Sequence, residues 1–155
     1  MIKLVRVDHR LLHGQVAFSW TSVLGIDCIL LVSDTLLDDP IRVTSIKLAK
    51  PTGVKIVMKN LADSIKAIKS GVTDKYKLFI VCETIDIAAK LVKEIGIKNL
   101  NIGGTKPDEN KKELGPAVFI DDKEKDILKS LINDGVYIYL QMVPEKNEID
   151  CSKLL

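Results

Sequence analysis

The sequence is poor in cysteine, and its few cysteines are not placed for disulfides or for a zinc site. Cys28, Cys82 and Cys151 lie far apart, no two of them form a CxxC pair, and their number is odd. This pattern favours free thiols in a reducing compartment. Cys28 and Cys82 also lie in apolar runs, where a thiol usually packs as a small hydrophobic side chain, so a cysteine nucleophile is not favoured.

An excess of one charge is also lacking. The chain has 23 Lys and Arg against 21 Asp and Glu, a formal net charge of +2. No long run of one sign builds the broad electric field that nucleic-acid binding usually needs. We therefore expect no nucleic-acid partner.

Long hydrophobic runs are absent as well. No stretch approaches the ~20 apolar residues of a membrane-spanning helix. Arg6 and Asp8 interrupt the N-terminal segment that a signal peptide would use. We expect a cytoplasmic protein that meets a membrane only through a partner.

The glycine motifs of nucleotide-binding proteins are missing too. The chain has no GxxxxGK[ST], and no GxGxxG follows its first predicted strand, so a nucleotide cofactor is not supported. Gly103 and Gly104 follow a later predicted strand. They are placed either to form a turn or to bring their backbone close to a phosphate.

Short apolar runs rich in β-branched residues recur along the chain, as is typical of strands. Between most of them, apolar residues have helical spacing, and glycines stand where C-terminal caps are expected, at Gly71, Gly96 and Gly135. The predicted strands are Ile2 to Val7, Cys28 to Val32, Val54 to Met58, Leu78 to Cys82, Leu100 to Ile102, Ala117 to Ile120 and Val136 to Leu140. The predicted helices include Gln15 to Leu24, Leu61 to Ile68, Ile87 to Ile95 and Ile127 to Ile132.

The alternation of strands and helices predicts an α/β fold. We expect a single-domain, three-layer open sandwich, with a mostly parallel sheet of about seven strands and helices on both faces. At most one edge strand is expected to be antiparallel. The chain's 155 residues fit one domain, residues 1–155. The charged stretch from Gly103 to Gly115 predicts an exposed loop.

The segment after the first predicted strand carries the most chemistry. Asp8, His9, Arg10 and His13 lie in a strand-to-helix loop, where open α/β sheets bind ligands. His13 precedes the predicted helix, whose first backbone amides and positive dipole end favour an anion. Arg10 offers a planar set of donors that matches phosphate oxygens, and Asp8 is placed to orient Arg10 or a histidine ring.

Plainer alternatives exist for the same residues. His13 is placed to cap the helix, and Asp8 and Arg10 to form an ordinary loop ion pair. His9 and His13 have the i, i+4 spacing of a helical metal site, but the chain has no third histidine, so we expect no metal.

The run from Asp8 to Val16, DHRLLHGQV, closely resembles the phosphorylation-site signature of the mannose/fructose/sorbose family of phosphotransferase system (PTS) IIB components, D-x-R-L-[IL]-H-G-Q-V. Later segments are also similar to the family's pattern: Ser33-Asp34, Lys50 to Val54, Asn101 to Gly104, Gly135-Val136 and Gln141 to Pro144. The stretch from Thr105 to Gly115 departs from the more basic segment of many members, so its partner contacts are not carried over.

The resemblance implies that His13 accepts a phosphoryl group, on its Nδ1 nitrogen, from a phosphohistidine of the IIA component. His13 would then pass it to a sugar held by the membrane components IIC and IID, which would keep the protein at the membrane surface. Arg10 matches the family's phosphate-orienting arginine at the same spacing. No cofactor is implied, because the phosphoramidate bond already stores the transfer potential.

Around these residues we expect a rim of phosphate-binding groups. These groups are Gly14, Gln15, Ser33, Asp34, Thr84 and Gly104. A loop-capping role is the alternative for Ser33, Asp34, Thr84 and Gly104. The competing function is a non-enzymatic anion-binding or regulatory α/β module. The sugar and the oligomeric state, including a homo-oligomer, are left open.

Overall fold

The computed structural model describes residues 1–155 and contains one seven-stranded sheet in the order β3-β2-β4-β1-β5-β8-β9. All neighbouring strands are parallel except β8 and β9, which are antiparallel at one edge. The strands of this sheet are β1 (Ile2–Asp8), β2 (Cys28–Val32), β3 (Lys55–Lys59), β4 (Leu78–Cys82), β5 (Asn99–Gly104), β8 (Tyr137–Leu140) and β9 (Ile149–Asp150).

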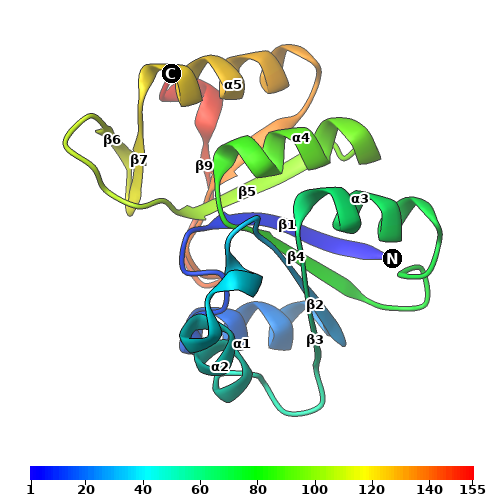
Figure 1. The fold of residues 1–155 in the computed structure, drawn as a ribbon. Coiled ribbons are helices and arrows are strands. Elements are labelled where there is room, and N and C mark those ends of the chain that lie inside the picture. The colour runs from blue at the N-terminus through cyan, green and yellow to red at the C-terminus, as the bar shows by residue number, and fades with distance from the viewer.

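Helices cover both faces of the sheet. Figure 1 shows α1 (Gly14–Leu24) and α2 (Pro40–Leu48) on one side. On the other side lie α3 (Leu61–Lys69), α4 (Ile85–Ile95) and α5 (Asp122–Asn133). Two separate hydrophobic clusters fill the spaces between these layers, one packed with α1 and α2 and the other with α3, α4 and α5. The expected three-layer α/β fold is therefore confirmed.

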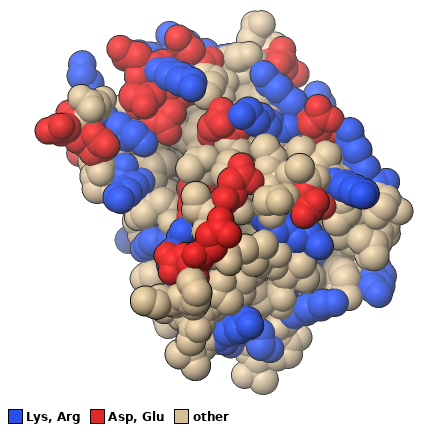
Figure 2. Space-filling model, viewed as in Figure 1, with Lys and Arg blue, Asp and Glu red and all other residues tan.

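The sequence explains the central strands and the helix ends. Every residue of β2 and β4 is buried, because strands with helices on both faces need apolar side chains on both sides. The predicted caps Gly71, Gly96 and Gly135 all have positive φ. Positive and negative side chains are interspersed over the face seen in Figure 2. None of the helices combines the length and the apolar character needed to cross a membrane.

The prediction was wrong for the segment around residues 103–120. Ala117 to Ile120 does not join the main sheet: β7 (Val118–Ile120) pairs with β6 (Lys112–Gly115) in a separate antiparallel hairpin. Part of the expected loop is therefore a strand. Thr105 Oγ1 anchors this hairpin near the end of β5, because it accepts a hydrogen bond from Phe119 N and donates one to Phe119 O, both at 2.7 Å.

One strand of the main sheet and one α-helix were also not predicted. The seventh strand of the sheet is β9, whose two residues are too few to show an alternating pattern. The helix α2 has only one fully buried residue, Ile46, so its apolar spacing is weak. Its N-terminus is nevertheless clearly marked, since Asp39 caps the amide of Arg42 and Pro40 is its first residue.

Candidate phosphoryl-binding site at the carboxyl end of β1

The loop between β1 and α1 lies in the middle of the sheet. β1 pairs with β4 on one side and β5 on the other. The chain leaves β1 for α1 on one face, whereas it leaves β4 for α4 on the opposite face (Figure 1). Such a reversal between neighbouring strands opens a crevice at their carboxyl ends, where α/β proteins bind ligands.

Two buried leucines hold this loop in place. Leu11 and Leu12 are buried, and Leu11 has a φ of 61°, which is uncommon for a side chain other than glycine. The amide of Leu11 donates to Asp8 O at 2.9 Å, and the amide of His9 donates to Gly104 O at 3.1 Å. A conformation of this kind costs about 1–3 kcal/mol and persists only where packing enforces it. The packing therefore fixes the path of the chain up to His13.

His13 is exposed at the start of α1. It occupies the N-cap position, but its side chain makes no capping hydrogen bond, so the structure does not support a plain capping role. Gly14 and Gln15, the first two residues of the helix, are exposed too. The first amides of a helix have no partner within it, so they and the helix dipole favour an anion beside His13.

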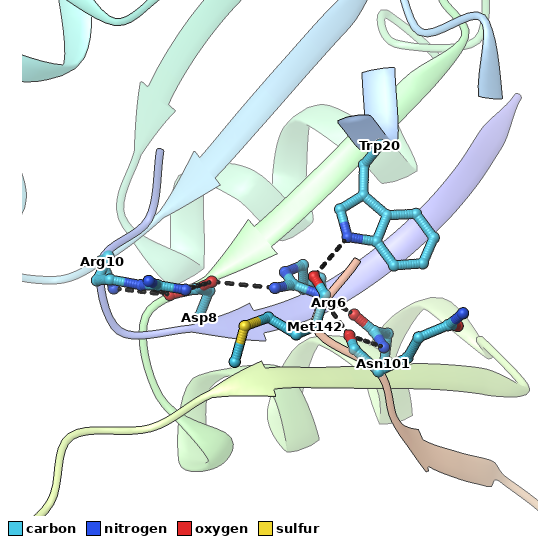
Figure 3. A network of polar contacts seen from close by, with 7 residues as sticks. Arg6, Asp8, Arg10, Trp20, Asn101 and Met142 are labelled. Carbon is cyan, nitrogen blue, oxygen red and sulfur yellow. Dashed lines mark hydrogen bonds and ion pairs between the residues drawn. The ribbon is translucent and has the colours of Figure 1, made fainter. Parts of the chain in front are cut away.

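Asp8 and Arg10 form a two-pronged ion pair at the carboxyl end of β1 (Figure 3). Arg10 Nε donates to Asp8 Oδ1 at 3.0 Å, and Arg10 Nη2 donates to Asp8 Oδ2 at 3.1 Å. The backbone amide of Arg10 also donates to Asp8 Oδ1 at 3.0 Å. Asp8 is buried, whereas 31% of the Arg10 side chain is exposed. Asp8 thus fixes one edge of the guanidinium and leaves Nη1 without a protein partner.

This arrangement modifies the expected role of Arg10. The Nε and Nη2 edge is already bound to Asp8, so only the outer Nη1 and Nη2 edge is available for a phosphate. That edge still offers two roughly parallel N–H groups. Asp8 therefore orients Arg10, not a histidine ring.

A second arginine contacts Asp8 from inside the protein. Arg6 Nη2 donates to Asp8 Oδ2 at 3.2 Å, and the Arg6 side chain is 1% exposed. Burial raises the pKa of the Asp8 carboxyl, but hydrogen bonds from Arg10 and the charge of Arg6 outweigh it and leave that pKa below its ordinary value. Asp8 is therefore ionised at neutral pH.

The other expected rim residues divide into two groups. Gly104 lies against the Asp8–Arg10 pair: a Cβ built on it would be 3.7 Å from Asp8 Oδ1 and 3.8 Å from Arg10 Nη2. Ser33 and Thr84 bind amides of the segments that follow them, whereas Asp34 binds the first residue of α3, 27 residues further on. Ser33 Oγ accepts from the amide of Leu36, Asp34 Oδ1 from that of Leu61, and Thr84 Oγ1 from that of Ile87.

The His9 side chain makes no hydrogen bond to this network. It lines a polar hollow of about 540 Å³, and its Nδ1 atom is buried without a hydrogen-bond partner. Since α1 begins only at Gly14, His9 and His13 do not share a helical face, and the basis for a metal site at i, i+4 is lost. No group of three or more possible metal ligands occurs in the chain.

Several residues of the network were not predicted. Arg6 lies in the middle of a buried strand and bonds to Asn101 and to the backbone of Gln141, while Trp20 Nε1 donates to Met142 O at 3.0 Å (Figure 3). The signal was present, because an arginine within an otherwise apolar strand needs buried partners.

An exposed histidine at a helix N-terminus and, three residues earlier, an arginine held by a buried carboxylate follow β1 of an open α/β sheet, in the region where such sheets bind ligands. Residues 2–155 match the family described as PTS system sorbose subfamily IIB component. The chain belongs to this family and is a IIB component of a sugar PTS. IIB components are phosphotransferase subunits.

Named relatives agree with this assignment. The chain is 32% identical over 145 residues to the N-acetylgalactosamine-specific phosphotransferase enzyme IIB component 1 of Escherichia coli (strain K12), covering 92% of this chain and 91% of that protein. It is 29% identical over 147 residues to the mannose-specific EIIAB component of the same strain, covering 92% of this chain but 45% of that protein.

A solved structure has the same fold. The crystal structure of the IIBSor domain of the sorbose permease from Klebsiella pneumoniae superimposes with a TM-score of 0.91 at 27% identity, covering 97% of this chain and 93% of that one.

Proposed function

We propose that His13 is a phosphoryl carrier: it accepts a phosphoryl group from a phosphohistidine of the IIA component and transfers it to a sugar during uptake through IIC and IID. The observation that carries this proposal is the placement of His13. Its side chain is exposed and makes no capping bond at the start of α1, and Arg10, three residues earlier, is held by Asp8 with its outer donors free.

The first transfer is a displacement at phosphorus. An unprotonated ring nitrogen of His13 forms a bond to the phosphorus while the N–P bond of the donor histidine breaks. The electron pair of that bond returns to the donor ring, which gains a proton as the His13 ring gives one up. In such a loose transition state the charge spreads over the three equatorial oxygens. The outer edge of Arg10 and the first amides of α1, at Gly14 and Gln15, would bind these oxygens without reorganising.

In the second transfer a sugar hydroxyl oxygen forms a bond to the phosphorus while the N–P bond of His13 breaks. The electron pair of that bond returns to the His13 ring, and the proton lost by the hydroxyl restores the neutral histidine. Both steps require a partner to approach His13 directly, and its exposure at the start of α1 fits that requirement. Residues 1–155 would act here as one IIB domain, in the cytoplasm and at the membrane surface through IIC and IID. No metal or nucleotide is required.

The names of the relatives bear on partners and substrate. One relative, by its name, is a mannose-specific EIIAB component, and this chain aligns with less than half of it. That agrees with IIA as the partner. The relatives are named for N-acetylgalactosamine, sorbose and mannose. Such variety on one fold agrees with a carrier whose sugar is chosen by the membrane components, so we propose no particular sugar.

The test is phosphorylation of the purified protein by a phosphorylated IIA component. We expect an acid-labile adduct on the wild type, none on His13→Ala and a normal adduct on His9→Ala, with circular dichroism spectra unchanged. An exposed loop residue contributes little packing, so the change at His13 should cost under ~0.5 kcal/mol of stability. If His9→Ala is the inactive variant, the wrong histidine is assigned. Reversible phosphate binding without an adduct would instead support the anion-binding module.

A further inference from the structure

Arg6 is the largest fully buried side chain in the protein, and the sheet supplies its partners. Its Nη1 donates to Asn101 Oδ1 at 2.6 Å and to Gln141 O at 2.8 Å, while its Nη2 donates to Asp8 Oδ2 at 3.2 Å. These acceptors come from β5, from the end of β8 and from β1 itself (Figure 3). Three acceptors around one planar group hold its orientation as well as its charge.

The backbone leaves room for this guanidinium at Gly103. A Cβ built on Gly103 would lie 1.9 Å from Cζ of Arg6, 2.0 Å from Nη2 and 2.3 Å from Nη1. Gly103 does not have a positive φ, so its backbone conformation does not demand glycine. Glycine is needed at this position because the Arg6 guanidinium lies directly against the main chain of β5.

The charges around Asp8 do not cancel. With Arg10 alone, the Asp8 carboxylate would form a neutral pair. With the second cation, Arg6, the three side chains together carry one uncompensated positive charge at the carboxyl end of β1, where an anion would bind. Arg6 also binds the same Oδ2 atom that accepts from Arg10 Nη2, so a displacement of Arg6 would shift the carboxylate that orients Arg10.

We propose that Arg6 is a positioning residue for phosphoryl transfer. It acts through Asp8: it fixes the carboxylate that orients Arg10, and it keeps the site positive for the incoming phosphoryl group. Gly103 is part of this device because it makes space for Arg6. The inference rests on the proposed function at His13 and deepens it, because it assigns a role to a residue that is too deeply buried to meet the phosphate.

The decisive variant is Gly103→Ala, which displaces the Arg6 guanidinium but changes no charge and no residue of the phosphorylation loop. We expect the rate constant for transfer at saturating phosphorylated IIA to fall by about 10- to 100-fold, the scale of a misplaced catalytic group. The concentration of IIA that gives half the maximal rate should change by less than about twofold, because the surface around His13 is unaltered.

Gly115→Ala is the matched control. Its added Cβ would also be crowded, at 2.5 Å from Leu140 Cδ2, but the atom it meets is the end of a buried apolar side chain that makes none of the hydrogen bonds to Arg6. We expect transfer at nearly the wild-type rate. Equal losses in the two variants would mean that crowding alone slows transfer, and would overturn the proposal.

A spectroscopic measurement tests the positioning without any transfer. In the wild type, Arg10 Nε–H donates to Asp8 Oδ1, so its ¹⁵N–¹H signal should exchange slowly with solvent. Gly103→Ala should shift this signal and speed its exchange, whereas Gly115→Ala should not. This readout does not depend on phosphorylation: a wild type that accepts no phosphoryl group would refute the proposed function and still leave the positioning testable.

A double variant tests whether Arg6 acts through Arg10. If it does, adding Gly103→Ala to Arg10→Lys should slow transfer by less than about threefold, because the group being positioned is already altered. The proposal would be overturned if the rate losses of the two single variants multiply in the double variant. It would also be overturned if the Gly103→Ala protein has a normal transfer rate and a normal Arg10 signal. If Gly103→Ala does not fold, Arg6→Lys replaces it. That variant keeps the charge but loses one arm of the fork, and we expect the same slow transfer with normal dependence on IIA.

Discussion

Replacing Asp8 with asparagine should destabilise the fold by removing the one anion between two arginines. The Asp8 side chain is 2% exposed and accepts side-chain hydrogen bonds from both Arg6 and Arg10. Removing one partner of a buried ion pair costs about 3–5 kcal/mol, because the other charge stays buried. Arg10 can turn toward water, so only Arg6 stays buried without its anion. We therefore expect a cost at the lower end of this range, about 3 kcal/mol at pH 7. For a protein of this size that lowers the melting temperature by roughly 6–12 °C.

The same carboxylate predicts how this loss depends on pH. The pKa of Asp8 is lower in the folded protein than its ordinary value of 3.8. A lowered folded pKa means that the contribution of Asp8 is fully present above the ordinary value and is lost as pH falls through the folded value. The stability difference between the wild type and Asp8→Asn should therefore stay constant from pH 7 to about pH 5 and shrink below about pH 4.

Urea unfolding at several pH values, followed by circular dichroism and by the fluorescence of Trp20, measures this difference. Trp20 is the only tryptophan in the chain, and its ring lies 5.7 Å from the Arg6 guanidinium carbon. The control is Asp134→Asn, since Asp134 is exposed and forms no ion pair, and we expect it to change stability by less than ~0.5 kcal/mol. A loss below about 1 kcal/mol for Asp8→Asn at pH 7 would show that Asp8 does not compensate a buried charge.

Three further predictions concern other groups. Arg10→Lys should slow transfer from phosphorylated IIA about 10- to 1,000-fold in rapid-quench measurements, because lysine cannot bind Asp8 and a phosphate with two separate edges; an unchanged rate would remove Arg10 from the mechanism. Trp20→Phe should cost about 0.5–1.5 kcal/mol in urea unfolding through the lost bond to Met142 O, and a neutral result would mean that water replaces it. Thiol reagents at pH 8 should react slowly with the folded protein and quickly in urea, since Cys28, Cys82 and Cys151 are all buried. Burial raises the pKa of each thiol, to about 12 for Cys82 and about 11 for Cys151, and rapid labelling of the folded state would contradict this burial.

The central sheet and its helices were predictable because their signals are local. β2 and β4 are continuous apolar runs, and α4 combines a Thr84 cap, apolar helical spacing and Gly96 at its end. Each of these signals lies within a dozen residues. The hairpin of β6 and β7 escaped prediction because β6 begins with two charged, exposed residues and resembles a loop, whereas β7 looks like any other brief apolar run.

The site was predictable only in part. The loop from Asp8 to His13 is contiguous, so its residue types and spacing can be read directly from the sequence. The roles of Ser33, Asp34 and Thr84 cannot be read from the sequence, because a polar residue after a strand serves equally well to bind a ligand or to cap a helix or turn. The structure shows capping hydrogen bonds for all three.

The class of fold and the position of the chemistry follow from the sequence alone, since hydrophobic periodicity and a nine-residue motif are both read over short distances along the chain. How that loop is held depends on the tertiary structure. Arg6 meets Asn101 and Gln141, which lie 95 and 135 residues further on, because the sheet order places β5 next to β1 and β8 next to β5. Polar contacts across neighbouring strands leave no periodic trace in the sequence, and the space that Gly103 leaves for a guanidinium exists only once β1 and β5 are paired.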